Sequence, residues 1–163
     1  SVSACMLFAE IAAWAKDNGK TVYQMLQDIY LEYGYSKEEG ISLVRKGKEG
    51  AEEIETMMRN FRENPLTKIA GSNVVLLKDY SSLEAIDFVS KERITLNMPT
   101  TANVLQYFTE DGTKLSIRPS GTEPKIKFYI EVHSKAPNTR EELKVMEAEA
   151  QNKVEQIRKE LGI

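Results

Sequence analysis

The segment Lys125–His133 alternates strictly between apolar and polar residues. Ile126, Phe128, Ile130 and Val132 occupy every second position, and the residues between them are charged or polar. Because neighbouring side chains of a β-strand point to opposite faces, this pattern predicts a strand with one buried and one solvated face. Such strands are typical of antiparallel sheets that are covered on one side only.

The rest of the chain from Ile41 onward supplies partners for this strand. The pattern predicts a hairpin of residues 104–108 and 114–118, with shorter strands at 41–45 and 73–77. Two amphipathic helices are expected, one at about 51–63 and one that begins at the capping box Thr139–Glu142. The order of elements predicts an α+β domain, in which an antiparallel sheet of about four strands carries both helices on one face. Residues 81–100 show no clear periodicity.

The first 34 residues predict a helical hairpin. A helix to about Asn18 ends at Gly19, and a capping box at Thr21–Gln24 opens a second helix that Gly34 ends. The first helix is apolar on nearly all sides, so we expect its packing partner to lie outside this hairpin. Tyr35–Gly40 is polar and is interpreted as a linker or hinge, which places a domain boundary between residues 1–40 and 41–163.

Composition excludes several classes of function. The chain carries 22 Lys and Arg against 25 Asp and Glu, and this net charge of -3 favours neither a nucleic acid nor an anionic membrane as partner. The only cysteine, Cys5, lies in an apolar run and is interpreted as a buried, inert thiol in a reducing, cytoplasmic protein. The only histidine, His133, is expected at the surface and not in a zinc site.

The connection from Arg118 to Lys125 is longer than a hairpin requires, because a tight turn needs only about two residues. Arg118 can present its guanidinium to two oxygens, and Ser120 and Thr122 offer hydroxyl donors. Gly121 lets a ligand approach the backbone amides. Strand alternation places Lys125 and Lys127 on the solvated face, so the loop is a candidate phosphate site.

A second interpretation of the loop stays open on the residues alone. Its Pro, Ser and Gly residues are also ordinary turn formers, and its cations can pair with Glu123 or Glu131. In that case the connection is only a solvated turn. Glu123 favours this interpretation, because a carboxylate repels a phosphate.

The residues Arg118-Pro-Ser-Gly-Thr-Glu-Pro-Lys125 closely resemble the phosphate-binding loop in the last domain of the α-D-phosphohexomutases, the phosphoglucomutase/phosphomannomutase family. Ala102-Asn-Val-Leu105, the Asp111-Gly112 turn and Lys127-Phe-Tyr-Ile130 also resemble this family, and its phosphoglucomutase branch is the nearest. The family's phosphate contacts fall on Arg118, Ser120, Gly121 and Thr122. Lys127 matches a more distant basic position of the family, and Lys125 is included on charge alone.

The opening helices resemble the end of the family's third domain at Ser3-Ala4 and Gly19-Lys-Thr21. The resemblance therefore implies that residues 1–40 end a preceding α/β domain and that 41–163 form the fourth, phosphate-binding domain. For this fourth domain it implies a fold similar to the TATA-box-binding protein. It also implies that the upstream domains of the same polypeptide are partners of this chain.

The resemblance implies a reaction as well. Family members move a phosphoryl group between the 1- and 6-positions of a hexose through a phosphoserine and a hexose 1,6-bisphosphate, with the help of Mg²⁺. The family's phosphoserine, magnesium and sugar motifs have no counterpart in this sequence. We therefore expect no catalytic or metal-binding residue in this chain and no activity for the chain alone.

One alternative is a free-standing α+β module that captures phosphorylated ligands without turning them over. The sequence does not distinguish glucose, mannose, glucosamine and pentose phosphates as ligands. It does not indicate an oligomeric state either.

Overall fold

The computed structural model describes residues 2–163, which divide into two compact units. One unit contains the chain up to Ser36 together with Ser134–Ala148, and the other contains Lys37–His133 with Glu149–Ile163. The first holds helices α1 (Val2–Asp17) and α2 (Val22–Tyr33). The two predicted helices are therefore confirmed.

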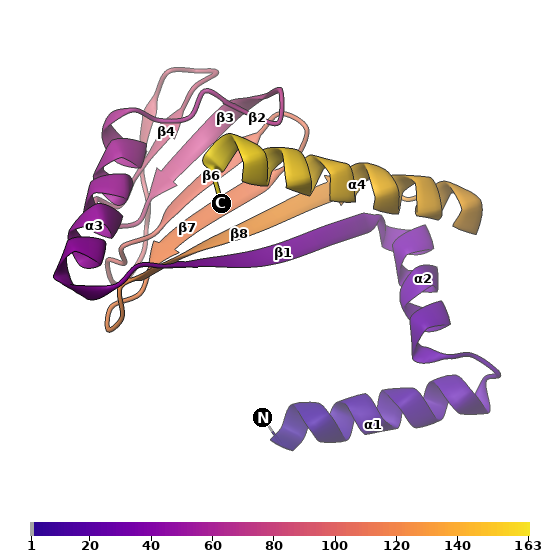
Figure 1. Cartoon of the computed structure of the whole chain (residues 1–163). Helices are drawn as coiled ribbons and strands as arrows, with labels where there is room; N and C mark the ends of the chain where they lie inside the picture. The colour runs from indigo at the N-terminus through magenta and orange to yellow at the C-terminus, as the bar shows by residue number, and fades with distance from the viewer. Residues whose placement is uncertain (1) are drawn as a thin grey trace. The chain divides into compact units, whose positions relative to one another are not determined.

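The second unit is built on an eight-stranded sheet with the order β1-β8-β7-β6-β3-β4-β5, in which β2 pairs with β3 (Figure 1). Every pairing among β2–β8 is antiparallel. The strands are β1 (Tyr35–Val44), β2 (Lys68–Ile69), β3 (Ser72–Asp79), β4 (Glu84–Asp87), β5 (Arg93–Thr95), β6 (Leu105–Thr109), β7 (Lys114–Pro119) and β8 (Lys125–Ser134). The predicted α+β class is confirmed, whereas the expected count of about four strands is too low.

The buried face of the sheet follows the predicted alternation. Leu105 lies opposite Ile117, which lies opposite Phe128, so one row of side chains crosses β6, β7 and β8. The next row on the same face includes Tyr107 and Leu115. All five side chains are completely buried, and they form the centre of the core.

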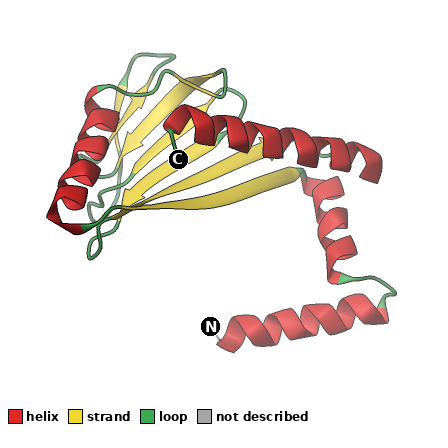
Figure 2. Ribbon diagram, in the orientation of Figure 1, coloured by secondary structure: helices red, strands yellow, loops and turns green. Residues whose placement is uncertain are grey.

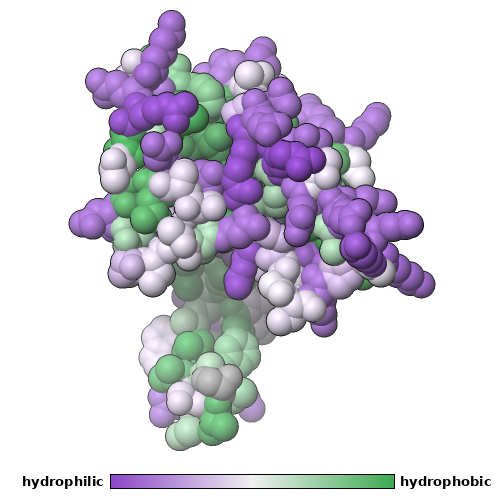
Figure 3. Space-filling view, turned by 90° about the vertical axis from the view of Figure 1, so that its left-hand side faces the viewer, coloured by the Kyte–Doolittle hydropathy of each residue, from purple (hydrophilic) through white to green (hydrophobic). Residues whose placement is uncertain are grey.

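Helix α3 (Gly47–Glu63) covers this face through Ile54 and Met58, which are buried. The Phe61 ring meets the Phe128 ring edge-on, with the centroids 6.3 Å apart. The Tyr107 hydroxyl donates a hydrogen bond of 2.6 Å to the Phe61 carbonyl oxygen, which satisfies an acceptor near the end of the helix. Figure 3 views the side on which α3 lies, and this face is mostly hydrophilic.

Helix α4 (Arg140–Leu161) is the last helix of the chain (Figure 2). Its side chains Val154 and Ile157 are fully buried and belong to the same core. Two contacts hold its last turns against loops of the sheet. Lys153 pairs with Asp111 in the β6–β7 turn, and the Glu160 carboxylate accepts a 2.8 Å bond from the Ala70 amide. The predicted sheet covered by two amphipathic helices is thus present.

Both predicted capping boxes supply the expected side-chain cap, and one is complete. At the start of α2 the Thr21 side chain accepts a hydrogen bond from the Gln24 backbone amide, and the Gln24 side chain accepts one from the Thr21 backbone amide. At the start of α4 the Thr139 hydroxyl accepts from the Glu142 amide at 3.1 Å. The Glu142 carboxylate, however, accepts from the amide of Asn138 at 2.7 Å.

Four local predictions need correction. Tyr35–Gly40 is not a linker but the first part of β1, a charged strand at the edge of the sheet; charged residues are common there because they prevent pairing with other chains. The helix predicted at about 51–63 begins earlier, because residues 47–50 form the first turn of α3. Residues 81–100, left without structure, contain β4 and β5. Cys5 is exposed, because nothing within residues 2–163 covers its side of α1.

Two further observations concern the surface. His133 is exposed, as predicted. None of the helices within residues 2–163 combines the length and the apolar character that a membrane span requires.

Candidate functional site

The loop between β7 and β8 is closed by its own backbone. The Ser120 amide donates to the Lys125 carbonyl at 2.7 Å, and the Lys125 amide donates to the Glu123 carbonyl at 2.7 Å. The Pro124 carbonyl accepts a 2.8 Å bond from the Arg45 amide, just after β1. The loop is therefore fixed to both neighbouring strands, and little of its conformational entropy remains to be lost when a ligand binds.

A cavity of about 350 Å³ opens beside this loop. Its lining contains every residue that the sequence predicts for the site: Arg118, Ser120, Gly121, Thr122, Lys125 and Lys127, together with Pro119. The fold thus brings the six predicted residues together. Whether they bind a phosphate stays a prediction.

In the described part of the chain, two of the three cations at this cavity have no carboxylate partner. Arg118 and Lys127 are register partners on β7 and β8, and both project from the solvated face of the sheet. Within residues 2–163 no carboxylate lies within ion-pairing distance of either side chain. Their positive charge is therefore left for a ligand.

The third cation, Lys125, pairs with Glu123 at 3.0 Å. This is the contact expected if the loop were only a solvated turn. The other carboxylate considered in that interpretation, Glu131, pairs instead with Lys114 at 2.7 Å. The solvated-turn interpretation thus accounts for Lys125 but not for Arg118 and Lys127.

The loop also leaves backbone donors free. The amides of Gly121 and Thr122 donate to no acceptor within residues 2–163. A Cβ at Gly121 would have no protein atom within 4 Å, and Gly121 does not need the left-handed backbone that favours glycine. Because neither packing nor backbone conformation requires this glycine, access to the adjacent amides is a sufficient reason for it.

A second cavity, of about 340 Å³, shares the loop as a wall. It lies on the side where α3 covers the sheet, and its lining adds five residues outside the loop: Gly47, Ala51, Ile54, Glu55 and Asn103. Sequence reasoning missed this set because residues from α3 and from the segment before β6 meet only in the folded chain. The only available signal was Ala102-Asn-Val-Leu105, which resembles a family segment.

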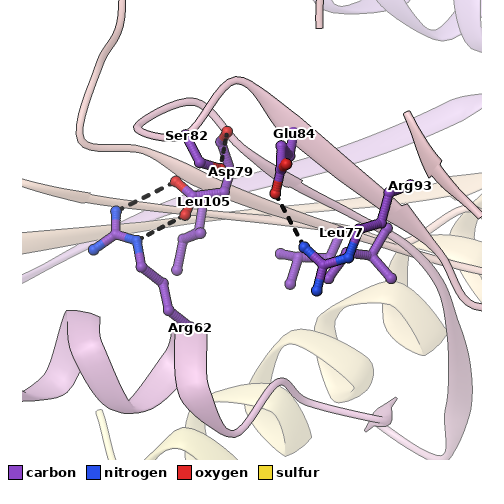
Figure 4. A pocket seen from close by; sticks show the side chains of 8 residues that line it. Arg62, Leu77, Asp79, Ser82, Glu84, Arg93 and Leu105 are labelled. Atoms are coloured by element: carbon purple, nitrogen blue, oxygen red, sulfur yellow. Dashed lines mark hydrogen bonds and ion pairs between the residues drawn. The ribbon is translucent and has the colours of Figure 1, made fainter. Parts of the chain in front are cut away.

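A third cavity, of about 150 Å³, lies between α3 and the β3–β5 part of the sheet. Figure 4 shows two ion pairs at its wall, Arg62 with Asp79 and Arg93 with Glu84, at 2.9 and 3.0 Å. The charged side chains of this cavity therefore already pair with one another, so none of them is left for a ligand.

A metal site is not evident in the described part of the chain. Within residues 2–163 no three His, Cys, Asp or Glu side chains cluster in a way that can hold an ion. Mg²⁺ needs oxygen ligands, usually with one or two carboxylates. The residues near the loop do not fit such a site, since Glu123 is paired with Lys125.

Residues 46–150 match the family model described as "Phosphoglucomutase/phosphomannomutase, C-terminal domain". The match contains the whole loop and both of its strands. This chain belongs to that family. The family assignment made from the loop is therefore confirmed.

Curated relatives agree with the assignment. A phosphoglucomutase of Staphylococcus saprophyticus is 36% identical over 113 residues, which cover 69% of this chain and 20% of the relative. One from Staphylococcus aureus strain RF122 is 34% identical over 132 residues, 81% of this chain and 23% of the relative. The chain thus spans about a fifth of the length of these relatives.

One similar solved structure is the open form of pp63/parafusin, a phosphoglucomutase from Paramecium. It is 15% identical, with a TM-score of 0.45, and the alignment covers 97% of this chain and 27% of that protein.

Proposed function

We propose that this chain is the substrate-phosphate-binding C-terminal portion of a phosphohexomutase that interconverts hexose 1-phosphate and hexose 6-phosphate. In this proposal the reaction passes through a phosphoserine and a hexose 1,6-bisphosphate. One observation carries the proposal: in a chain of this family, one cavity is lined by two cations and two backbone amides that have no partner within residues 2–163. Its ligand is a phosphorylated hexose.

Each group of the loop has a distinct part in binding. The Arg118 guanidinium donates to two phosphate oxygens, and the Gly121 and Thr122 amides donate to a third. Lys127 adds positive charge from the neighbouring strand, and the Ser120 hydroxyl is a further donor. At about 1.5–3 kcal/mol for each charge-assisted hydrogen bond, a few such contacts outweigh the cost of ordering the ligand.

The loop serves the end of the substrate that is not reacting. Both ends of a hexose bisphosphate must reach the same serine in turn, so the distal end needs a site that recognises phosphate and not the sugar ring. Binding energy from such a remote site orients the reacting end, which raises kcat as well as affinity. This division of labour explains why a phosphate site is useful in a chain without a nucleophile.

The proposal places the remaining machinery in the upstream domains of the same cytoplasmic polypeptide. These domains supply the phosphoserine and the Mg²⁺ ligands, so this chain alone is inactive. They also cover α1, where Met6, Phe8 and Trp14 are 66, 59 and 56% exposed. Large apolar side chains exposed to this extent on one helix are typical of a surface that has a partner.

The experiment compares Arg118→Ala and Arg59→Ala in the full-length enzyme that contains this chain. Arg59 is exposed on α3 and lies outside both loop cavities, so it is a matched control. We expect Arg118→Ala to lower kcat/KM for glucose 1-phosphate by about 10- to 100-fold, the loss of one or two charge-assisted bonds, and Arg59→Ala to leave it unchanged. Equal rates for both variants, or turnover by the isolated chain, would refute the proposal.

A further inference from the structure

The phosphate loop separates two cavities of different electrostatic character. The first is basic, because Arg118, Lys125 and Lys127 line it. The second has no lysine or arginine in its lining and contains the carboxylates of Glu55 and Glu123. A phosphate is attracted to the first cavity and repelled from the second, so the second cavity suits a part of the ligand that carries no negative charge.

Asn103 in the second cavity is held in one orientation. Its side-chain oxygen accepts a 2.6 Å hydrogen bond from the Arg62 guanidinium. Arg62 is itself fixed by a forked contact with Asp79, with distances of 2.9 and 3.5 Å, as Figure 4 shows. Only the oxygen of an amide can accept from a guanidinium, so the assignment of the two amide atoms follows from chemistry.

This orientation leaves the Asn103 NH₂ group with two free donors. The group has no acceptor within residues 2–163, and Asn103 lines the cavity together with Ser120, Gly121 and Thr122. On the α3 side the Glu55 carboxylate likewise has no hydrogen bond within the described residues. One wall therefore offers donors and another offers an acceptor, and neither is satisfied by the protein.

The lining of this cavity also has an apolar part. Ala51 and Ile54 of α3 form it, and Ile54 is 5% exposed. A hexose presents hydroxyls, each both donor and acceptor, at its rim and C–H groups on its faces. An amide donor, a carboxylate acceptor and an aliphatic surface match these two features.

We propose that the second cavity is a hydroxyl-binding subsite for the sugar part of a ligand whose phosphate lies on the basic side of the loop. Asn103 donates to one ring hydroxyl, and Glu55 accepts from another. Arg62 is a positioning residue, which acts on the ligand only through Asn103. The inference rests on the proposed function, and it adds sugar recognition by residues of this chain.

The test measures dissociation constants of this chain for two probes, inorganic phosphate and glucose 1-phosphate, by amide NMR titration. The variants are Asn103→Ala and Glu55→Ala, with Asn60→Ala as a matched control on the exposed part of α3. Arg118→Ala reports on the phosphate site itself. Thermal unfolding of each variant checks that the fold is retained.

We expect Asn103→Ala and Glu55→Ala each to weaken glucose 1-phosphate binding by about three- to tenfold, the loss of one hydrogen bond. Phosphate binding should stay within about twofold for Asn103→Ala, while Arg118→Ala weakens both probes. If Asn103→Ala and Glu55→Ala leave the ratio of the two affinities unchanged while Arg118→Ala weakens both, the subsite is refuted and the phosphate site stands. If the wild-type chain binds neither probe, both proposals are refuted.

Discussion

Arg118 and Lys127 lie opposite each other on adjacent strands, and within residues 2–163 neither has a carboxylate partner. Two like charges held side by side repel each other, at a cost that an added anion removes. The nearest carboxylate of the loop, Glu123, is paired with Lys125. Glu123 therefore limits how much positive charge the loop offers to a ligand.

This pairing predicts a gain of affinity from one substitution. Glu123→Gln removes a negative charge from the loop and releases Lys125, so phosphate should bind this chain several-fold more tightly. The Glu123 side chain is 64% exposed, so the effect should shrink as salt is raised. Titrations with phosphate at low and high ionic strength provide the measurement, with Glu52→Gln as a control at an exposed position of α3. Unchanged affinity at low salt would contradict the charge argument.

Tyr107 should make the fold sensitive to alkaline pH. Burial raises the pKa of its hydroxyl to about 12, against an ordinary value of 10.0. Because the folded-state pKa is the higher one, its contribution to stability is complete below pH 10 and is lost as the pH rises toward 12. Tyr107→Phe should unfold more easily at pH 7, by about 1–2 kcal/mol, since the Phe61 carbonyl loses its donor.

Denaturant unfolding from pH 7 to 11.5 checks this expectation. The wild type should lose more stability over this range than Tyr107→Phe does. If the free energy of unfolding fell equally with pH in both proteins, Tyr107 would not titrate as its burial predicts.

Asp111 should make the stability of the fold fall at acid pH. Burial raises the pKa of this carboxyl, but hydrogen bonds from Lys153, Thr109 and Thr113 outweigh burial and hold the pKa below its ordinary 3.8. A lowered folded-state pKa gives stability that is present above about pH 4 and is lost as the pH falls further. Asp111→Asn should be less stable than the wild type at pH 7, and the difference should narrow below pH 4.

Thermal unfolding between pH 2.5 and 7 measures this narrowing. Asp87→Asn is a useful comparison, because backbone bonds from Ser90 and Val89 lower the pKa of that exposed carboxyl. A constant difference between wild type and Asp111→Asn at all pH values would contradict the assignment.

Gly34 should tolerate no side chain. It ends α2 with a φ of 103°, and a Cβ there would lie 2.7 Å from the Ser134 carbonyl oxygen. Gly34→Ala should therefore destabilise its unit by about 1–3 kcal/mol or more. Gly19→Ala is the control, because its φ of 67° is also left-handed but nothing lies within 4 Å of the added carbon. If both variants lost the same stability in thermal unfolding, the cost would come from backbone strain alone and not from the clash with Ser134.

The strands at the centre of the sheet were predictable, whereas only residues 41–44 of the edge strand β1 and none of β4 and β5 were. Phe128 and Ile130 lie between charged or polar neighbours on β8, and their burial enforces the alternation that the sequence shows. The edge strand β1 buries little of either face, so its polar residues mimic a linker. The short strands β4 and β5 follow from pairing, β4 with β3 and β5 with β4, and such pairing leaves no local pattern in the sequence.

The candidate site was likewise only partly predictable from the sequence. The loop residues from Arg118 to Lys127 are contiguous in sequence, so spacing and strand alternation were enough to group them. Asn103 and Glu55 join the neighbouring cavity only because α3 folds over the sheet. Long-range contacts of this kind leave no trace in local sequence, and the second cavity had to be found in the structure.

The central claim is that the β7–β8 loop binds the substrate phosphate through free backbone amides and Arg118. The most direct measurement is an amide NMR titration of this chain with inorganic phosphate, followed at Gly121 and Thr122. We predict saturable shifts at these two amides that Arg118→Ala abolishes and Arg59→Ala preserves. Shifts that spread over unrelated lysines, or that survive Arg118→Ala, would contradict the claim.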